Sequence, residues 1–278
     1  MKATLSPKTK PTYDTKLFSD TVNRLRAFFL ERGFLEVHTQ DRLSILAACE
    51  DPETVSTYGY ENEVWPLPQT GQMWLEYELL TKPELPGVFC VSTSYRNEPN
   101  PIPGRHERIF PMFEFEAPGT MEDLVALESA LCTHMGLGEE SEFAHLEYED
   151  AMKHYNTDDI SAEEEMKMRD EFGRVVFLKN FPEHTSPFWN MNRAGEIARK
   201  VDVIIDGMET IGSAERSSDR EEMKRRFATI SDGEYAALLY EKFGEDRVKK
   251  ELKEFFELEF FPRFGGGIGM TRMMRACQ

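Results

Sequence analysis

The sequence predicts an α+β fold, an antiparallel β-sheet flanked by helices, in a single domain over residues 1–278. Two observations favour this class. Segments with a helical apolar period are interspersed with strands that return through hairpins. The chain also lacks the GxxxxGK(S/T) loop and the strand-linked GxGxxG turn of many nucleotide-binding proteins. We therefore expect neither a P-loop nor a Rossmann arrangement.

The first half of the chain alternates helix and strand signals. Apolar residues recur at helical spacing across residues 15–32, and Gly33 ends that helix. The segments expected next are a strand at 34–39, a β-rich strand at 88–95, a strand at 111–116 and a helix at 121–135. Alternating apolar and acidic residues in 111–116 are typical of a half-exposed strand. A loop rich in Pro, Gly and Asn, 97–108, indicates a long hairpin.

The second half begins with an acidic, polar stretch at about 138–173, which is predicted to be a partly inserted surface segment. Within it, residues 146–155 read as the end of a strand and the start of a helix. The segments expected after it are buried strands at 175–179 and 201–205 and helices at 219–227 and 233–257. The chain closes with GGGIGMTRMMRACQ, which is interpreted as a glycine turn leading into a helix.

The charge of the chain restricts its partners. Its 278 residues include 51 acidic and 33 basic side chains, which gives a formal net charge of −18. Such a field repels polyphosphates, so sequence-independent binding of nucleic acid is not expected. A local basic patch could still dock RNA.

Several features favour a cytoplasmic protein. No stretch approaches the roughly 20 apolar residues that span a bilayer, and the N-terminus lacks the apolar region of a secretory signal. The cysteines are far apart, at Cys49, Cys90, Cys132 and Cys277, with no CxxC pair. We therefore expect reduced thiols and no cysteine-based zinc site.

The first group of candidate residues surrounds the predicted hairpin. Arg96 and Glu98 follow a strand, and Arg105 and His106 lie on the loop. An arginine at a strand end can bind a phosphate or carboxylate through two hydrogen bonds. Phe110, on the returning strand, offers a flat face for a purine. The alternative is that Arg96 and Glu98 form a surface ion pair.

A second group lies in the segment from Asp202 to Arg216. Asp202 and Glu209 are separated by an odd number of positions, so a regular strand would turn them to opposite faces. A bend near Gly207 would bring both carboxylates to one Mg²⁺, which takes few carboxylates together with phosphate oxygens. Two solvated acids at strand ends are the alternative.

The third group is the C-terminal run from Gly265 to Arg272. Its glycines allow the backbone to approach a ligand, and a helix N-terminus favours anions. A glycine-rich loop alone is weak support for a site.

The order of these groups is more specific than any one of them. RxE…RH…F, then D-x6-E-x6-R, then GGGxGxxR resemble motif 2, the metal-binding block and motif 3 of class II aminoacyl-tRNA synthetases. Three more segments extend the resemblance over nearly the whole chain, nearest the asparaginyl enzymes within the aspartyl, asparaginyl and lysyl group. They are GFLEVHT at 33–39 (motif 1), TGQMWLE at 70–76 and FLKNFPEHTSPFW at 177–189.

The resemblance implies a class II synthetase fold and an ATP site. The residues that would bind ATP are Arg96, Glu98, Arg105, His106, Phe110, Glu209 and Arg272. Glu98 would contact the adenine side and Phe110 would stack under the ring. Arg105 and His106 would meet the outer phosphates.

The resemblance also implies the reaction, an in-line attack of a carboxylate on the α-phosphorus of ATP. Arg96 and Arg272 would be catalytic. Arg96 would hold the α-phosphate and the substrate carboxylate, while Arg272 would stack over adenine and reach the γ-phosphate. Asp202 and Glu209 would bind Mg²⁺ with the ATP, and Gln72 would meet the α-amino group of the amino acid.

The choice of amino acid is predicted to depend on Arg216, with Gln72 and Glu114 completing the amino-acid site. Arg216 stands where lysine-specific relatives carry an acid, so it favours a carboxylate or amide side chain. The alternative is that Arg216 pairs with Glu215, Glu114 or another acid of the chain. Leu75 stands where aspartyl enzymes carry a lysine, and Ile109 replaces a glutamate, so the substrate is expected to be aspartate, asparagine or a related amino acid.

Two departures bear on partners. Relatives of this group carry an N-terminal β-barrel that reads the anticodon, and here about a dozen residues precede the region of resemblance. Gln40 stands where motif 1 has a proline tied to the dimer interface, although the rest of the motif still predicts a homodimer.

The favoured hypothesis is a ligase that forms an aminoacyl-adenylate from ATP and passes the aminoacyl group to a small nucleophile or a carrier, as an asparagine synthetase would. Aminoacylation of tRNA by a truncated synthetase and a non-catalytic regulatory paralogue are the alternatives.

Overall fold

The computed structural model describes residues 13–40, 43–47, 53–102, 104–185 and 188–278. Cys49 and part of the 177–189 motif lie outside these ranges. The helices are α1 (Thr15–Glu31), α2 (Gln72–Thr81), α3 (Met121–His134), α4 (Tyr148–Tyr155), α5 (Ala162–Phe172), α6 (Arg220–Thr229), α7 (Glu234–Phe243), α8 (Glu245–Phe256) and α9 (Met270–Ala276). The strands are β1 (Leu35–Glu36), β2 (Thr57–Tyr60), β3 (Glu63–Pro66), β4 (Val88–Tyr95), β5 (Ile109–Pro118), β6 (Ala144–Glu147), β7 (Val175–Pro182), β8 (Arg193–Ala194), β9 (Ile197–Ile205), β10 (Met208–Arg216) and β11 (Arg263–Gly269).

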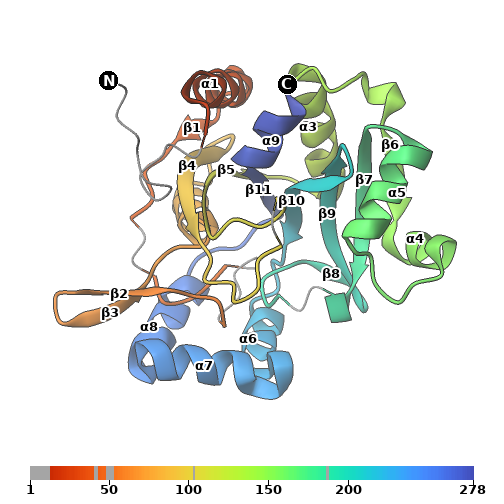
Figure 1. The fold of residues 1–278 in the computed structure, drawn as a ribbon. Helices are drawn as coiled ribbons and strands as arrows, with labels where there is room; N and C mark the ends of the chain where they lie inside the picture. Colours follow the sequence, from red (N-terminus) through yellow and green to blue (C-terminus); the bar gives the residue numbers. More distant parts are fainter. Residues whose placement is uncertain (1–12, 41–42, 48–52, 103, 186–187) are drawn as a thin grey trace, which may run out of the picture.

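A central sheet organises the molecule, with the strand order β1-β4-β5-β11-β10-β9-β7-β6 and β8 paired to β9. Neighbouring strands are antiparallel except at the two edges, where β1 pairs with β4 and β6 with β7 in parallel. Figure 1 shows this sheet between two groups of helices. The α+β class and its antiparallel sheet are confirmed. The strand predicted at 34–39 shortens to the two residues of β1.

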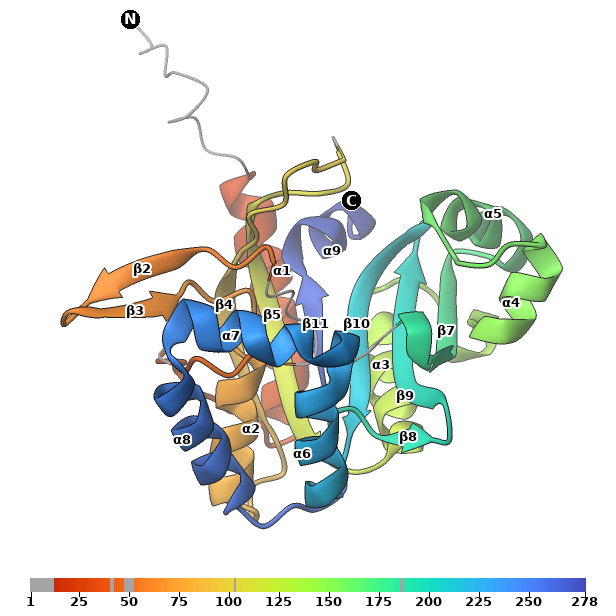
Figure 2. The same ribbon diagram turned by 90° about the horizontal axis from the view of Figure 1, so that it is seen from below.

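The two faces of the sheet have different coverings. Helices α1, α3 and α9 pack on one face through an aromatic and aliphatic core that includes Phe29, Phe113 and Ile268. On the other face α2 contacts β4 and β5, and α6, α7 and α8 pack beside it around the buried Trp189. Figure 2 shows these four helices in front of the central strands. The helix predicted at 233–257 is two helices, because Gly244 adopts φ 88° between them.

The predicted long hairpin is present. Strands β4 and β5 pair from Val88–Glu116 to Tyr95–Ile109, and the loop that joins them carries two of the arginines of interest. The expectation of a half-exposed strand at 111–116 is wrong, since Glu114 and Glu116 are fully buried. Both acids have partners inside the protein, which compensate the cost of removing a carboxylate from water.

A second hairpin, β9–β10, carries the predicted metal ligands. Its two-residue turn is Asp206-Gly207, and both residues have positive φ (51° and 78°), as a tight turn between twisted strands requires. Glu209 lies opposite Ile204, and Asp202 is two residues from Ile204 on β9. Residues opposite each other, and residues two apart, share a face of a sheet. The hairpin therefore turns both carboxylates to the same side.

The C-terminal glycines form a strand and not the predicted turn. β11 lies between β5 and β10 in the middle of the sheet. A Cβ on Gly265 would lie 1.6 Å from a carboxylate oxygen of Glu116, and one on Gly267 would lie 2.7 Å from Met112. Glycine is thus required here because side chains of the neighbouring strand cross over this part of β11.

The acidic stretch at 138–173 is more than a surface insertion. β6 extends the central sheet, and α4 and α5 pack against β7 and β9 around the buried Met168 and Val176. The strand and helix expected within 146–155 are present as β6 and α4.

Candidate active site

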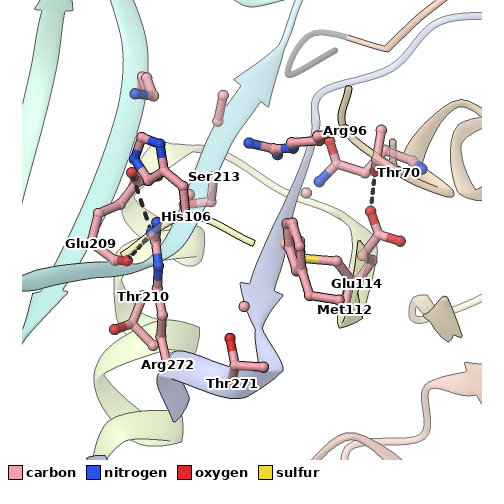
Figure 3. Close-up of a pocket in the computed structure, with 18 of the residues that line it drawn as sticks. Thr70, Arg96, His106, Met112, Glu114, Glu209, Thr210, Ser213, Thr271 and Arg272 are labelled. Carbon is pink, nitrogen blue, oxygen red and sulfur yellow. Dashed lines mark hydrogen bonds and ion pairs between the residues drawn. The ribbon is translucent and has the colours of Figure 1, made fainter. Parts of the chain in front are cut away.

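A cavity of 310 Å³ opens over the middle of the sheet, on the face turned away from α1 and α3, with the first residues of α9 at its edge. β5, β11 and β10 form its floor, where Gly265, Gly267 and Gly269 supply backbone without side chains. In Figure 3, Glu209, His106 and Arg272 gather on one side of the cavity, and Arg96, Thr70 and Glu114 lie on the other. Of the predicted site residues, the cavity is lined by Gln72, Arg96, Glu98, Arg105, His106, Phe110, Glu114, Glu209, Arg216 and Arg272.

Arg96 follows β4 directly, and its guanidinium carbon lies 5.5 Å from the centre of the Phe110 ring. Its Nε is buried and has no hydrogen-bond partner, and Arg96 makes no ion pair with an acid, within the described ranges. The surface ion pair with Glu98 is therefore not formed. A buried guanidinium atom without a partner is costly, so this position favours binding of an anionic group from outside the chain.

The remaining predicted nucleotide residues are paired with one another or with nearby groups. His106 Nδ1 lies 2.9 Å from an Oε atom of Glu98. Arg272 donates to the backbone carbonyl of Glu209, and one of its nitrogens lies 3.8 Å from the Glu209 carboxylate. Burial lowers the pKa of Arg272, and the charge of Glu209 opposes that shift. Arg272 also donates to the backbone carbonyl of Arg105 at 3.3 Å, so it connects the loop to the β9–β10 hairpin.

The two predicted metal ligands meet over Gly212. The position that a Cβ would occupy on Gly212 is 3.0 Å from Glu209 Oε1 and 3.6 Å from Asp202 Oδ1. Asp202 Oδ1 is buried and has no hydrogen-bond partner among the described residues. Asp202 itself lines an adjoining hollow shared with Glu209, not the main cavity. Burial raises the pKa of Asp202 to about 7, although the Lys200 ammonium opposes the shift.

This arrangement fits a divalent cation. Two carboxylate oxygens face one small space, and a glycine leaves that space open. No group of three or more His, Cys, Asp or Glu side chains in the described part of the chain is placed to hold a metal. Because Mg²⁺ is usually held by one or two carboxylates plus substrate phosphates, the pair matches a site completed by a nucleotide.

Arg216 is already engaged inside the protein. Its Nε and one terminal nitrogen donate to the two carboxylate oxygens of Glu116, at 3.0 and 3.1 Å, and Glu76 lies 3.8 Å away. Arg263 donates to the other side of Glu76. The internal-acid alternative for Arg216 is therefore realised, with Glu116 as the acid. Burial raises the pKa of Glu116 to about 7, against the opposing charge of Arg216.

The other two predicted amino-acid residues lie beside Arg216 in the cavity wall. Glu114 accepts hydrogen bonds from the Gly71 backbone at 2.9 Å and from the Thr70 hydroxyl. Gln72 begins α2, and its backbone N–H donates to Thr70 Oγ1 at 3.1 Å. Glu215 turns away, because its carboxylate accepts from the Met121 backbone at 2.9 Å and from Asn192.

The number of cations and carboxylates around the cavity determines whether a polyphosphate can bind there. The arginines and lysine that line it are Arg96, Arg105, Lys200, Arg216 and Arg272, and the carboxylates that line it are Glu98, Glu107, Glu114 and Glu209. Three further carboxylates pair with these cations from the side, namely Glu165, Asp202 and Glu116. Since the carboxylates outnumber the cations in this set, a triphosphate requires additional positive charge.

Two of these residues were missed from the sequence. Glu165 lies on α5, where it accepts from the Glu209 backbone N–H at 3.0 Å and from the Arg105 guanidinium. Burial raises the pKa of Glu165, and hydrogen bonding to Arg105 opposes this. Glu165 stands in a run of three glutamates, so nothing in the local pattern separates it from the other two. Lys200 is the second, two residues before Asp202.

Glu165→Gln is expected to raise KM for ATP about tenfold with little change in kcat, because Arg105 loses the carboxylate that holds its guanidinium in place for the outer phosphates, and this loss of positioning outweighs the removal of one negative charge. Steady-state kinetics with ATP varied measure this. Glu163→Gln is the matched control, since Glu163 is 76% exposed on the same helix and pairs with Lys167. An unchanged KM in the Glu165 variant would show that α5 contributes only to packing.

This chain is similar in sequence to a family of known proteins. A family model described as tRNA synthetases class II (D, K and N) matches residues 7–277. The probable cytoplasmic asparagine–tRNA ligase of Schizosaccharomyces pombe is 27% identical over 63% of this chain and 37% of its own length. The aspartate–tRNA(Asp/Asn) ligase of Methanopyrus kandleri is 23% identical over 93% of this chain and 63% of its own length.

Solved structures show the same fold. The asparaginyl-tRNA synthetase of Pyrococcus horikoshii, complexed with asparaginyl-adenylate, superposes with a TM-score of 0.76 at 20% identity, over 94% of this chain and 64% of that chain. The chain spans 25 to 63% of the length of the curated relatives it matches. In the described ranges no helix is both long and apolar enough to cross a membrane, and Cys90, Cys132 and Cys277 are free thiols. Since the family model covers almost all of the sequence, this chain belongs to the class II tRNA synthetases of the aspartate, lysine and asparagine group.

Proposed function

We propose that the chain is a ligase that activates an amino acid with ATP and Mg²⁺ to form an aminoacyl-adenylate. The observation that carries this proposal is the position of Arg96, which lines the same cavity as Glu209 and Arg272 and whose buried Nε has no hydrogen-bond partner in the described ranges. Asp202 lies in the hollow that adjoins this cavity and shares Glu209 with it. One cavity thereby offers a place for an α-phosphate, for outer phosphates and for a metal. A regulatory paralogue without chemistry would have no need of this combination.

In the proposed reaction the α-carboxylate of the amino acid attacks the α-phosphorus, a new O–P bond forms, and the bond to the β-phosphate breaks to release pyrophosphate. Arg96 binds the carboxylate and the α-phosphate, and so brings two anions together that would otherwise repel. Phe110 supports the adenine, and Arg272 and His106 bind toward the outer phosphates. Asp202 and Glu209 would hold Mg²⁺, which supplies charge neutralisation at the polyphosphate.

The pocket for the amino-acid side chain favours an amide. The charge of Arg216 is already balanced by Glu116, and the buried Glu114 adds a further carboxylate to the wall. A carboxylate side chain would meet like charges there, which costs several kcal/mol when buried. An amide presents an N–H group to a carboxylate and a carbonyl to a guanidinium. We therefore propose asparagine, or a related amide, ahead of aspartate.

Asparagine is expected to support ATP–pyrophosphate exchange with a kcat/KM at least about tenfold above that of aspartate, because of the like-charge repulsion just described. The experiment measures exchange for each of the twenty standard amino acids at saturating Mg²⁺–ATP. Preference for aspartate would overturn the pocket assignment, and no exchange with any of them would overturn activation of a standard amino acid.

The acceptor is proposed to be a small nucleophile or a carrier, since a net charge of −18 opposes docking of bulk tRNA. The names of the curated relatives, which are tRNA ligases, favour tRNA as the second candidate. Charging of unfractionated tRNA with labelled asparagine separates the two.

The proposed homodimer is supported by two exposed leucines. Leu30 of α1 is 52% exposed and Leu35 of β1 is 49% exposed.

A further inference from the structure

Lys200 projects from β9 into the site. Positions 200 and 202 lie on the same face of a strand, and Lys200 Nζ lies 2.8 Å from Asp202 Oδ2. The ammonium also sits 4.0 Å from the centre of the Phe181 ring, and the side chain is only 18% exposed. Lys200 lines both the main cavity and the adjoining hollow that contains Asp202 and Glu209.

The two oxygens of Asp202 therefore have different surroundings. Oδ2 receives the lysine, whereas Oδ1 has no partner among the described residues and faces the space above Gly212 together with Glu209. A fixed positive charge next to a metal position acts in two directions at once. It repels a divalent cation and attracts the phosphates of a nucleotide.

We propose that Lys200 belongs to the polyphosphate site. Its ammonium pairs with one carboxylate oxygen of Asp202 and binds nucleotide phosphate alongside the metal. The inference rests on the proposed function for the identity of the ligand, a nucleoside triphosphate. Lys200 thereby supplies part of the positive charge that a triphosphate requires and that divalent ions would otherwise provide. The site is thereby tuned for weaker metal binding in the empty protein and for stronger binding of metal-free nucleotide.

Lys200→Met tests the proposal through two binding measurements that require no turnover. Affinity for ATP in the presence of EDTA, measured by calorimetry, is expected to fall on the order of tenfold. Affinity of the nucleotide-free protein for Mn²⁺, measured by electron paramagnetic resonance, is expected to rise several-fold. These opposite changes distinguish the proposal from a structural ion pair, since a distorted site would lose both affinities.

Lys179→Met is the matched control, because Lys179 lies on the neighbouring strand β7 and does not line the cavity. Its Nζ lies 3.4 Å from a carboxylate oxygen of Glu147. Lys200→Gln repeats the test with a polar side chain in case the methionine variant does not fold. Two affinities that fall together, or that both stay at the wild-type values, overturn the role of Lys200. If the wild-type protein binds no ATP, the proposed function fails, and the Mn²⁺ measurement still decides whether Lys200 weakens metal binding.

Discussion

Replacing Arg96 with methionine is expected to lower kcat/KM for amino-acid-dependent pyrophosphate exchange on the order of 10³-fold or more. The half-buried guanidinium lies 5.5 Å from the centre of the Phe110 ring and lacks an acidic partner in the described ranges, so its charge is available to the reacting groups. In the proposed transition state that charge faces both the attacking carboxylate and the α-phosphate. Most of the loss is therefore expected in kcat, with a smaller change in KM for ATP.

Arg96→Lys refines this experiment. Lysine keeps the charge but loses the planar fork that holds two oxygens, so it is expected to recover only part of the activity. Arg225→Met serves as the control, since Arg225 is exposed on α6 and pairs with Glu222 of the same helix, away from the cavity. Near wild-type exchange in the Arg96→Met variant would remove this residue from the reaction.

Glu209→Gln is expected to abolish measurable exchange at millimolar Mg²⁺, with a loss on the order of 10³-fold. Glutamine keeps the shape and the backbone hydrogen bond to Glu165 but removes one of the two carboxylates that face Gly212. The same change removes the acid that lies nearest Arg272. Exchange measured across a range of Mg²⁺ concentrations should show activity rising only at concentrations well above those that saturate the wild type.

The matched control lies in the same hairpin. Asp206→Asn removes an equal charge from the turn, where Asp206 forms an exposed pair with Arg174, and asparagine suits a turn residue with positive φ. The Asp206 variant is expected to retain wild-type activity. Full activity in the Glu209→Gln variant would contradict the metal assignment.

Much of the site was predictable because its residues follow one another in recognisable order. Arg96, His106 and Arg272 lie far apart in the sequence, and the cavity brings them together as the motif order implied. The sequence could also predict that Asp202 and Glu209 point to the same face of the sheet, since the Asp-Gly pair between them predicts a tight turn. These residues stand in short motifs, so local sequence patterns are able to identify them.

Contacts within the protein were harder to predict. Alternation in 111–116 indicated an exposed face for Glu114 and Glu116, yet both are buried because Thr70, Gly71 and Arg216 satisfy them. Those partners come from other parts of the chain, so no local pattern reports them.

The same limit applies to Glu165, which reaches the site from a stretch that composition alone marks as surface. The glycines of β11 illustrate a related point. Their sequence is typical of a turn. They form a strand because the side chains of Glu116 and Met112 on the neighbouring strand β5 occupy the space that side chains on β11 would need.

The most direct test of the account follows the oxygen atoms of the substrate. Asparagine labelled with ¹⁸O in its α-carboxylate is incubated with the protein, ATP, Mg²⁺ and hydroxylamine, and the nucleotide products are examined by mass spectrometry. Attack on the α-phosphorus transfers one labelled oxygen to the phosphate, so the account predicts AMP that carries a single ¹⁸O together with the hydroxamate of asparagine. ADP accompanied by ¹⁸O in inorganic phosphate would place the attack on the γ-phosphorus and contradict adenylate formation.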